Sequence, residues 1–220
     1  MHGGTLARAG RPRGSSREML EEAAAELFLE QGYARTTVEE IARRAGVSRN
    51  TFFNYFPVKS DLLWVDVDAG LAELPRALKR CPEGVPVTDA VRQALHEVAA
   101  GFGPGRVPWA LTQAEVMGTR APLEASALSR FVTNGELLSR FVAARVGTAQ
   151  TGPAQGGPAR HDLAGRSFAM AVLAAAAAAA AVWAGSGVSR GNLAPYVDAG
   201  IAPACEGYRA ALATTENRTG

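Results

Sequence analysis

The feature that most constrains this chain is a glycine that separates two short amphipathic segments. Gly46 lies between residues 38–45 and residues 48–56, and both segments carry apolar side chains at helical spacing. Glycine adopts positive φ without steric cost, so the chain can turn sharply at this point. The small side chain of Ala42 allows the second helix to cross the first closely. Together these positions predict a helix-turn-helix motif.

Polar residues at the ends of the two segments predict where the helices begin. Thr36 and Thr37 each stand three residues before a glutamate, so either threonine could form a capping box at the start of the first helix. Ser48 is placed to cap the second helix, and Pro57 limits its other end. The apolar side chains expected to wedge the two helices together are Ile41, Ala45, Val47, Phe52 and Tyr55.

Helical periodicity extends over nearly the whole chain, and the sequence has neither an alternating strand pattern nor an internal repeat. The chain has 220 residues, 47% of them apolar, which is enough to build a core. We therefore expect an all-α fold of about nine helices. The predicted ranges are 20–31, 38–45, 48–56, 59 to near Pro75, 87–100, 109–117, 121–146, 161–185 and 192–214.

Residues that could carry catalysis are scattered along the chain. His2, His96 and His161 lie far apart, and neither metal-ligand spacing nor a phosphate-binding glycine loop is visible. Two cysteines cannot make a disulfide framework. We therefore predict no metal, no cofactor and no enzymatic activity, and an all-α enzyme is the alternative from another class.

One segment requires a membrane test, because residues 168–184 carry no charge over seventeen residues. This length is at the lower limit for a spanning helix. Most of the segment is alanine, including eight consecutive residues from Ala174 to Ala181, and alanine is only weakly apolar. We interpret it as a buried helix, and we expect a soluble cytoplasmic protein that has no signal peptide and no membrane partner.

The run GYARTTVEEIARRAGVSRNTFFNYFPVKSDLLW at residues 32–64 closely resembles the DNA-binding domain of TetR-family transcriptional regulators. The resemblance covers about residues 15–65. The matching residues are Thr37, Thr51, Tyr55, Phe56, Pro57 and Lys59. Phe53 departs from the family pattern, in which tyrosine is common at this position. More weakly, residues 51–68 resemble the subgroup of regulators associated with mycofactocin gene clusters.

The resemblance implies two domains and a function. Before them, Arg8, Arg11 and Arg13 precede any acidic residue, so residues 1–14 are expected to form a flexible basic arm that can pair with phosphates, for which a merely solvated tail is the alternative. Residues 15–60 would form a three-helix helix-turn-helix domain, and residues 61–220 a helical ligand-binding and dimerisation domain. The expected protein is a repressor at the nucleoid that binds a palindromic operator in double-stranded DNA as a homodimer. A small hydrophobic effector, for which an acyl-CoA-like molecule is one candidate, would release it; a regulator without an effector is the alternative.

The predicted recognition helix has two distinct faces. Phe52, Tyr55 and Phe56 are spaced i, i+3, i+4 and are expected to pack inward. Arginine can bond guanine, asparagine can bond adenine, and an aromatic ring can touch a thymine methyl group. The candidate base readers are therefore Arg49, Asn50, Phe53 and Asn54, with simple solvation as the alternative for the asparagines. The candidate phosphate contacts, which the resemblance also implies, are Thr37, Ser48, Thr51, Tyr55 and Lys59.

Two further sites are expected in the second domain. Residues 161–214 are the candidates for the homodimer interface, because alanine lets helix backbones approach closely; burial within one subunit is the alternative. Tyr196, Ile201, Cys205 and Tyr208 are expected to supply the other side of this interface. The candidate effector pocket comprises Phe102, Trp109, Gln113, Met117, Arg120 and Phe131, with ordinary core packing as the alternative for each.

Overall fold

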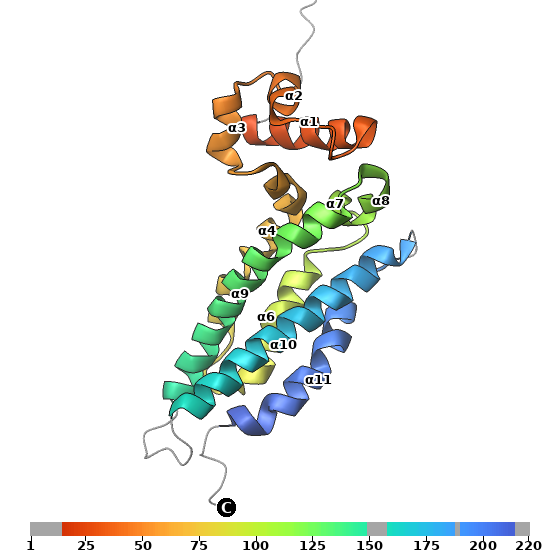
Figure 1. Ribbon diagram of the computed structural model, residues 1–220. Helices are drawn as coiled ribbons and strands as arrows, with labels where there is room; N and C mark the ends of the chain where they lie inside the picture. The colour runs from red at the N-terminus through yellow and green to blue at the C-terminus, as the bar shows by residue number, and fades with distance from the viewer. Residues whose placement is uncertain (1–14, 149–157, 188–189, 214–220) are drawn as a thin grey trace, which may run out of the picture. The chain divides into compact units, whose positions relative to one another are not determined.

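The computed structural model describes residues 15–148, 158–187 and 190–213, and these ranges contain helices and no strand (Figure 1). The predicted all-α fold is confirmed. The α-helices are α1 (Ser16–Gln31), α2 (Val38–Arg44), α3 (Arg49–Tyr55), α4 (Val65–Leu71), α5 (Leu74–Arg80), α6 (Val87–Ala100), α7 (Trp109–Thr112), α8 (Ala114–Met117), α9 (Arg120–Thr148), α10 (Pro158–Gly185) and α11 (Ala194–Leu212). A 3₁₀ helix, η1 (Lys59–Trp64), precedes α4. The basic arm predicted at residues 1–14 lies outside the described residues.

The chain forms two compact units, each with its own set of internal contacts. The smaller unit contains the described residues up to Leu62 together with Val116–Gly118. The larger unit contains Leu63–Glu115 and the described residues from Thr119 onward. The short return of the chain at 116–118 into the smaller unit was not predicted from the sequence. There the amide of Tyr33 donates a hydrogen bond of 2.7 Å to the carbonyl oxygen of Met117.

Capping residues fix the ends of the short helices in the smaller unit. A capping box links Ser15 to Glu18 at the start of α1, and another links Thr37 to Glu40 at the start of α2. The sequence left Thr36 and Thr37 as equal candidates for the second box. Thr36 is instead buried, and its hydroxyl donates to the carbonyl oxygen of Gly32 at 2.9 Å.

Gly46 has a φ of 69°, which confirms the sharp turn predicted between α2 and α3. The hydroxyl of Ser48 accepts the amide of Thr51 at 3.0 Å and caps α3, as expected. Phe52 and Phe56 are buried, but Tyr55 is 41% exposed, so its predicted inward orientation is wrong. The reason is the length of α3, because a seven-residue helix buries only a narrow i, i+4 stripe and Tyr55 lies beside it.

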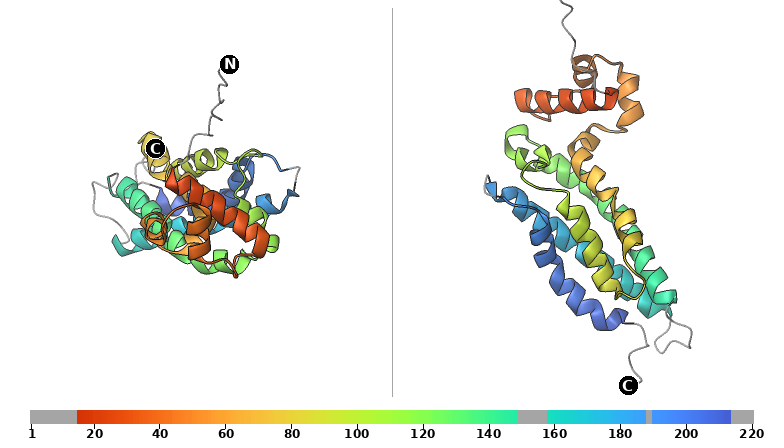
Figure 2. Two further views of the ribbon diagram at one scale, coloured as in Figure 1. Left: turned by 90° about the horizontal axis from the view of Figure 1, so that it is seen from above. Right: turned by 180° about the vertical axis from the view of Figure 1, so that it is seen from behind.

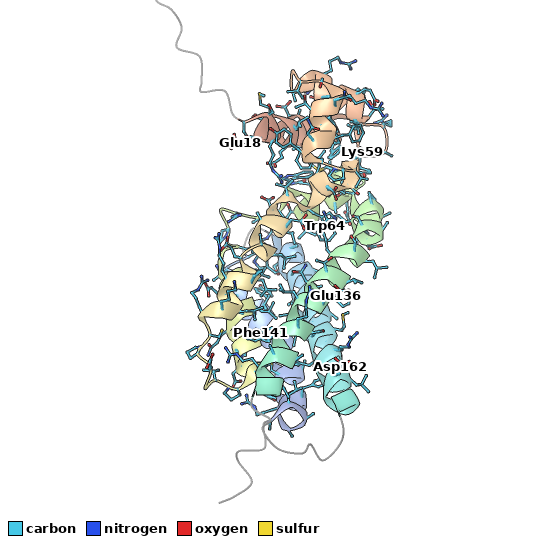
Figure 3. The ribbon with its side chains drawn as sticks, turned by 90° about the vertical axis from the view of Figure 1, so that its left-hand side faces the viewer. Glu18, Lys59, Trp64, Glu136, Phe141 and Asp162 are labelled. Carbon is cyan, nitrogen blue, oxygen red and sulfur yellow. The ribbon has the colours of Figure 1, made fainter. Side chains whose placement is uncertain are left out.

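Lys59 ties the end of the smaller unit to the loop between α1 and α2 (labelled in Figure 3). Its ammonium group donates to the carbonyl oxygens of Tyr33 at 2.8 Å and Thr36 at 2.7 Å. The same nitrogen lies 4.0 Å from the centroid of the Tyr33 ring. Partial burial lowers the pKa of Lys59 and raises that of the Tyr33 hydroxyl.

Two of the predicted helices are divided in the structure. The helix expected from 59 to Pro75 becomes η1, α4 and α5, with Pro75 in the first turn of α5. Proline fits there because the first amides of a helix have no partner inside the helix. The helix expected at 109–117 breaks at Gln113 into α7 and α8. These short pieces are the main difference from the nine expected helices.

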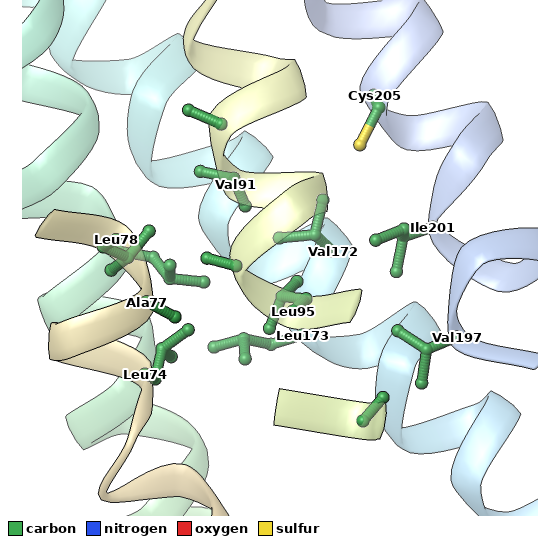
Figure 4. Close-up of a cluster of buried hydrophobic side chains, with 14 of the residues drawn as sticks. Leu74, Ala77, Leu78, Val91, Leu95, Val172, Leu173, Val197, Ile201 and Cys205 are labelled. Carbon is green, nitrogen blue, oxygen red and sulfur yellow. The ribbon is translucent and has the colours of Figure 1, made fainter. Parts of the chain in front are cut away.

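The core of the larger unit is built from the apolar faces of α5, α6, α9, α10 and α11, and Figure 4 shows part of it. Its buried side chains include Leu74, Leu78, Val91, Leu95, Val172, Leu173, Val197, Ile201 and Cys205. α10 and α11 lie side by side in both side views (Figures 1 and 2). At Gly200 an added Cβ atom would lie 3.1 Å from both the carbonyl oxygen of Ala175 and the Cβ of Ala179. Glycine and alanine therefore allow these two helices to approach each other closely.

α10 buries one side within its own subunit and leaves the other exposed. Trp183 is 1% exposed and donates its indole N–H to the carbonyl oxygen of Gly191 at 2.9 Å. Val182, its neighbour, is 64% exposed. Among the described residues, Asp162–Gly185 is long and apolar enough to cross a membrane by length and composition, and 39% of the tested window is buried. Ile201 and Cys205, expected at the interface with a partner, instead pack into the core of their own subunit.

Candidate nucleic-acid interface

The four candidate base readers all lie exposed on α3. Ser48 caps the helix, Phe52 fixes its buried side, and the opposite side faces solvent. The exposed residues are Arg49, Asn50, Phe53 and Asn54. Phe53 is 41% exposed, and its ring packs edge-on against Phe52 with 5.4 Å between the ring centroids. This side of α3 offers a guanidinium, two amides and one aromatic ring, which are groups able to recognise base edges.

Arg49 is held by two neighbours, one of which the sequence did not identify. Its Nε atom lies 2.7 Å from a carboxylate oxygen of Glu39, in the first turn of α2. Its guanidinium carbon lies 5.2 Å from the centroid of the Phe53 ring, one helical turn further along α3. The contact with Phe53 follows from i, i+4 spacing, whereas the contact with Glu39 depends on how the two helices pack.

Three of the candidate phosphate contacts also serve as caps or cap partners. The Thr37 hydroxyl donates to Glu40 at 2.9 Å and accepts the Glu40 amide at 3.2 Å. The hydroxyl oxygens of Ser48 and Thr51 lie 2.8 Å apart. These bonds orient the three hydroxyls at the beginnings of α2 and α3. The bonds to the phosphate backbone stay predictions.

Tyr55 and Lys59, the other two phosphate candidates, differ in their surroundings. Tyr55 is exposed at the end of α3, where its side chain is accessible to a ligand. Lys59 is only partly exposed, and two of its three N–H groups are already given to backbone carbonyl oxygens. This anchoring role could not be predicted from the sequence, because the carbonyl partners lie more than twenty positions earlier in the chain. A phosphate bond from Lys59 stays a prediction.

Two family models match this chain. The model described as bacterial regulatory proteins of the tetR family matches residues 20–63, which include the smaller unit's three helices apart from the first residues of α1. The model described as the MftR C-terminal domain matches residues 85–209, more than half of the chain. The chain belongs to the TetR family. The predicted resemblance, including that to the mycofactocin-associated subgroup, is therefore confirmed.

Curated relatives and solved structures agree with this membership. The mycofactocin biosynthesis regulator MftR of Mycobacterium tuberculosis is 29% identical over 64% of this chain and 70% of its own length. The regulator TcmR of Streptomyces glaucescens is 34% identical over 60% of this chain and 61% of its own length. NalD of Pseudomonas aeruginosa, at 21% identity, has the same fold with a TM-score of 0.55, covering 87% of this chain and 96% of that one.

This TetR-family chain is a helix-turn-helix transcriptional regulator and not an enzyme, as the sequence predicted, because its matching families and relatives are regulators. Membership implies a soluble protein of the cytoplasm. Within the described residues, no group of three or more histidine, cysteine, aspartate or glutamate side chains could hold a metal ion.

Of the six candidate pocket residues of the regulator, Phe102 lines a cavity described in the larger unit. This cavity of about 140 Å³ lies between α4, α5 and α6, and Gly70, Val98 and Arg106 also line it. Arg80 and Glu97 form an ion pair at its wall. This volume is below the range typical of pockets for drug-sized ligands.

The other five candidates have separate environments. Gln113 and Arg120 are exposed, and Trp109 is half-buried. Phe131 packs against the edge of the hydrophobic core. Met117 is buried in the smaller unit, whereas the other five candidates belong to the larger unit. A common pocket for these residues stays a prediction.

A polar cluster in the larger unit joins the beginning of α4 to α9. The indole N–H of Trp64 donates to the Ser126 hydroxyl at 2.8 Å. The guanidinium of Arg130 donates twice to the carboxylate of Asp68, with two N–O distances of 2.8 Å, and lies over the Trp64 ring. No local pattern predicts this pair, because Asp68 and Arg130 lie 62 positions apart in the sequence.

Proposed function

We propose that this regulator represses transcription by binding a palindromic operator in double-stranded DNA through α3. The observation that carries the proposal is the exposed side of α3, on which Arg49, Asn50, Phe53 and Asn54 lie together. The major groove of DNA accepts an α-helix, and base-edge contacts there specify sequence. Because a seven-residue helix reaches few base pairs, a specific site requires two copies related by a two-fold axis.

Contacts to the sugar-phosphate backbone would fix the position of α3 in the groove. We assign them to Thr37, Ser48, Thr51 and Tyr55, with Lys59 as a further candidate. Their hydroxyls lie at the two ends of α3 and at the start of α2. Such contacts raise affinity for all sequences and carry no base information.

The partner in the dimer would be a second copy bound through α10 and α11, within residues 161–214. Both helices carry exposed stripes of small or apolar side chains at helical spacing. The stripes comprise Ala174, Ala177, Ala178, Ala181 and Val182 on α10, and Ala199, Pro203, Gly207 and Ala210 on α11. Small side chains permit close helix packing, and burial of apolar surface contributes about 25 cal/mol per Å².

Release by a small hydrophobic effector completes the proposal, and an acyl-CoA-like molecule remains one candidate. An effector that binds one state of the larger unit more tightly shifts the population toward that state. The bonds from Trp64 and Arg130 hold the beginning of α4 to α9. A ligand that separates these helices would therefore move the first helix that follows the DNA-binding unit in the chain.

The DNA-binding part of the proposal is tested by selection and footprinting. Immobilised protein is incubated with genomic fragments, and the recovered DNA is footprinted at several salt concentrations, because phosphate contacts weaken as salt rises. We expect a short inverted repeat. Arg49→Ala and Asn54→Ala should reduce sequence preference more than general affinity, whereas Tyr55→Phe should weaken binding to all sequences. Uniform loss in all three variants would contradict the assignment of base readers.

The dimer is tested by sedimentation of a variant with a charge on the exposed side of α10. Ala178→Glu should dissociate the dimer, because a carboxylate in an apolar interface is costly to desolvate. Ala143→Glu, on an exposed position of α9, is the matched control and should leave the dimer intact. A wild-type protein that sediments as a monomer would contradict the proposal.

The effector is tested by screening small hydrophobic molecules, acyl thioesters among them, for release of the protein from the selected duplex. Release supports effector control. Binding to DNA that no compound in the screen relieves favours the second candidate function, a regulator without an effector.

A further inference from the structure

Two exposed arginines of the helix-turn-helix, Arg44 and Arg49, are bound in different ways. Arg44 uses both terminal nitrogens of its guanidinium, which donate to Glu26 at 3.1 Å and to Glu30 at 2.8–2.9 Å. Both terminal nitrogens of Arg44 are therefore engaged in joining α2 to α1. Arg49 forms an ion pair with Glu39 in which the closest atoms are Nε and a carboxylate oxygen, 2.7 Å apart. The closest contact therefore involves Nε and not the two terminal NH₂ groups of Arg49.

The edge of the Arg49 guanidinium that carries the two terminal NH₂ groups is an edge that can recognise guanine. Two parallel N–H donors of arginine match the O6 and N7 acceptors of guanine in the major groove. Glu39 holds the opposite edge, and the ring of Phe53 lies against the face of the same group at 5.2 Å. Two contacts from different directions thus restrict a side chain that would otherwise sample many rotamers.

We propose that Glu39 is a positioning residue that determines specificity by holding Arg49 ready to read a base. This inference rests on the proposed function, in which Arg49 is a base reader. A side chain that is ordered before binding loses less conformational entropy on binding, so more of the contact energy appears as affinity for the correct base. Misplaced rotamers that reach a neighbouring base are also disfavoured.

The size of the effect is limited by solvent. The side chains of Arg49 and Glu39 are 62% and 58% exposed, and exposed ion pairs contribute little. The carboxylate of Glu39 also repels DNA phosphates, so its removal should raise affinity for every sequence. Discrimination between bases and general affinity must therefore be measured separately.

The experiment uses full-length protein and a duplex selected by the wild type from a random-sequence library. Binding is measured for this duplex and for each single-base-pair variant of it. The protein variants are Arg49→Ala, Glu39→Ala, Glu39→Gln, the double variant of Arg49→Ala with Glu39→Ala, and Glu30→Ala as the control at the Arg44 pair. Thermal unfolding of each variant confirms that the helix-turn-helix is folded.

We expect Arg49→Ala to lose discrimination at one base pair, and Glu39→Ala to reduce discrimination at that same base pair about two- to fivefold. Glu39→Gln should retain most of it, because the amide oxygen can still lie beside the Nε atom of Arg49. The double variant should equal Arg49→Ala, and Glu30→Ala should leave the base preference unchanged.

Two results would overturn the inference, and they are distinguishable from failure of the proposed function. If Glu39→Ala raises affinity for all duplexes equally and keeps the discrimination, Glu39 only repels phosphates. If the double variant discriminates less than Arg49→Ala, Glu39 acts without Arg49. If Arg49→Ala itself keeps full discrimination, the assignment of Arg49 as a base reader fails first.

Discussion

The two units of this regulator hold their helices by different means. In the smaller unit α2 and α3 have seven residues each, and polar groups bind their ends and the loop before them. In the larger unit α9 and α10 have 29 and 28 residues and pack through apolar side chains. Isolated helices shorter than about 12–15 residues are marginal in water. The short helices thus depend on specific bonds, and the long ones depend on burial.

The difference between polar anchoring and apolar burial fits the kind of surface that each unit exposes to solvent. A short helix with a single buried residue can present most of its circumference to a ligand, provided that other groups fix its position. α3 does so, with Phe52 inside and polar residues outside. α10 does not need polar groups to fix its position. Its exposed alanines can pack closely against another surface but form no side-chain hydrogen bonds.

The strongest test of the contrast removes the only buried side chain within α3. Phe52→Ala should destabilise the smaller unit by about 3–5 kcal/mol, because Phe52 is fully buried and no other residue of α3 can fill the cavity. DNA binding should be lost. Chemical unfolding followed by circular dichroism, together with fluorescence anisotropy of labelled operator, measures both effects.

Leu138→Ala on α9 is the control, since Leu138 is equally buried but lies in the larger unit. It should cost about 2–5 kcal/mol and spare operator binding under conditions where the protein is folded. Operator binding that survives Phe52→Ala would show that α3 does not need this anchor.

A smaller loss is expected from the polar anchor itself. Lys59→Met keeps most of the side-chain stem but removes the ammonium group that binds the carbonyl oxygens of Tyr33 and Thr36. Bonds to charged groups contribute about 1.5–3 kcal/mol, and we expect a loss of stability in that range. Denaturant unfolding measures it. Lys79→Met, at an exposed position of α5, should change stability by less than about 0.5 kcal/mol. Equal effects of the two substitutions would contradict an anchoring role.

Close helix packing in the larger unit predicts a loss of about 1 kcal/mol for Gly200→Ala. Alanine favours helix, but its Cβ would lie 3.1 Å from a carbonyl oxygen and another Cβ of α10, neither of which can rotate away. Gly147→Ala on α9, outside the proposed dimer interface, is the matched substitution, because its added Cβ would meet nothing within 4 Å. It should raise stability by up to about 1 kcal/mol. Thermal unfolding at a fixed protein concentration compares them, and stabilisation by both would argue against tight packing at Gly200.

Local signals made much of the smaller unit predictable. Gly46, Ser48 and the Thr37–Glu40 pair act within four residues of their own positions, so the sequence displays them directly. The same holds for long periodic segments such as α9.

Contacts between distant residues were not predictable in this way. Lys59 binds carbonyl oxygens that any residue could supply, and the pairing of Glu39 with Arg49 requires the crossing of two helices. The position of Met117 in the smaller unit likewise depends on a return of the chain that no local pattern marks. Four of the candidate pocket residues had only their apolar character in common, which core packing explains equally well, and no local pattern placed Gln113 or Arg120 beside them.

The smallest expected effect is a pH dependence that belongs to the capping box of α2. Hydrogen bonds from the Thr37 amide and hydroxyl lower the pKa of Glu40 below its usual value of 4.5. The folded form thus favours the carboxylate. Its contribution to stability is present above pH 4.5 and is lost as the pH falls through the lowered pKa of the folded state. Glu40→Gln should remove this contribution.

Unfolding of the wild type and of Glu40→Gln between pH 6 and pH 3 should therefore converge toward the acid end. Thr37→Val keeps the backbone amide but loses the hydroxyl, so it should retain a reduced version of the same pH dependence. The larger unit contains no part of this box, and its unfolding should not distinguish the wild type from Glu40→Gln. A stability difference that stays constant from pH 6 to pH 3 would mean that the charge of Glu40 does not support α2, and the contrast between polar anchoring and apolar burial would then rest on Lys59 and Thr36.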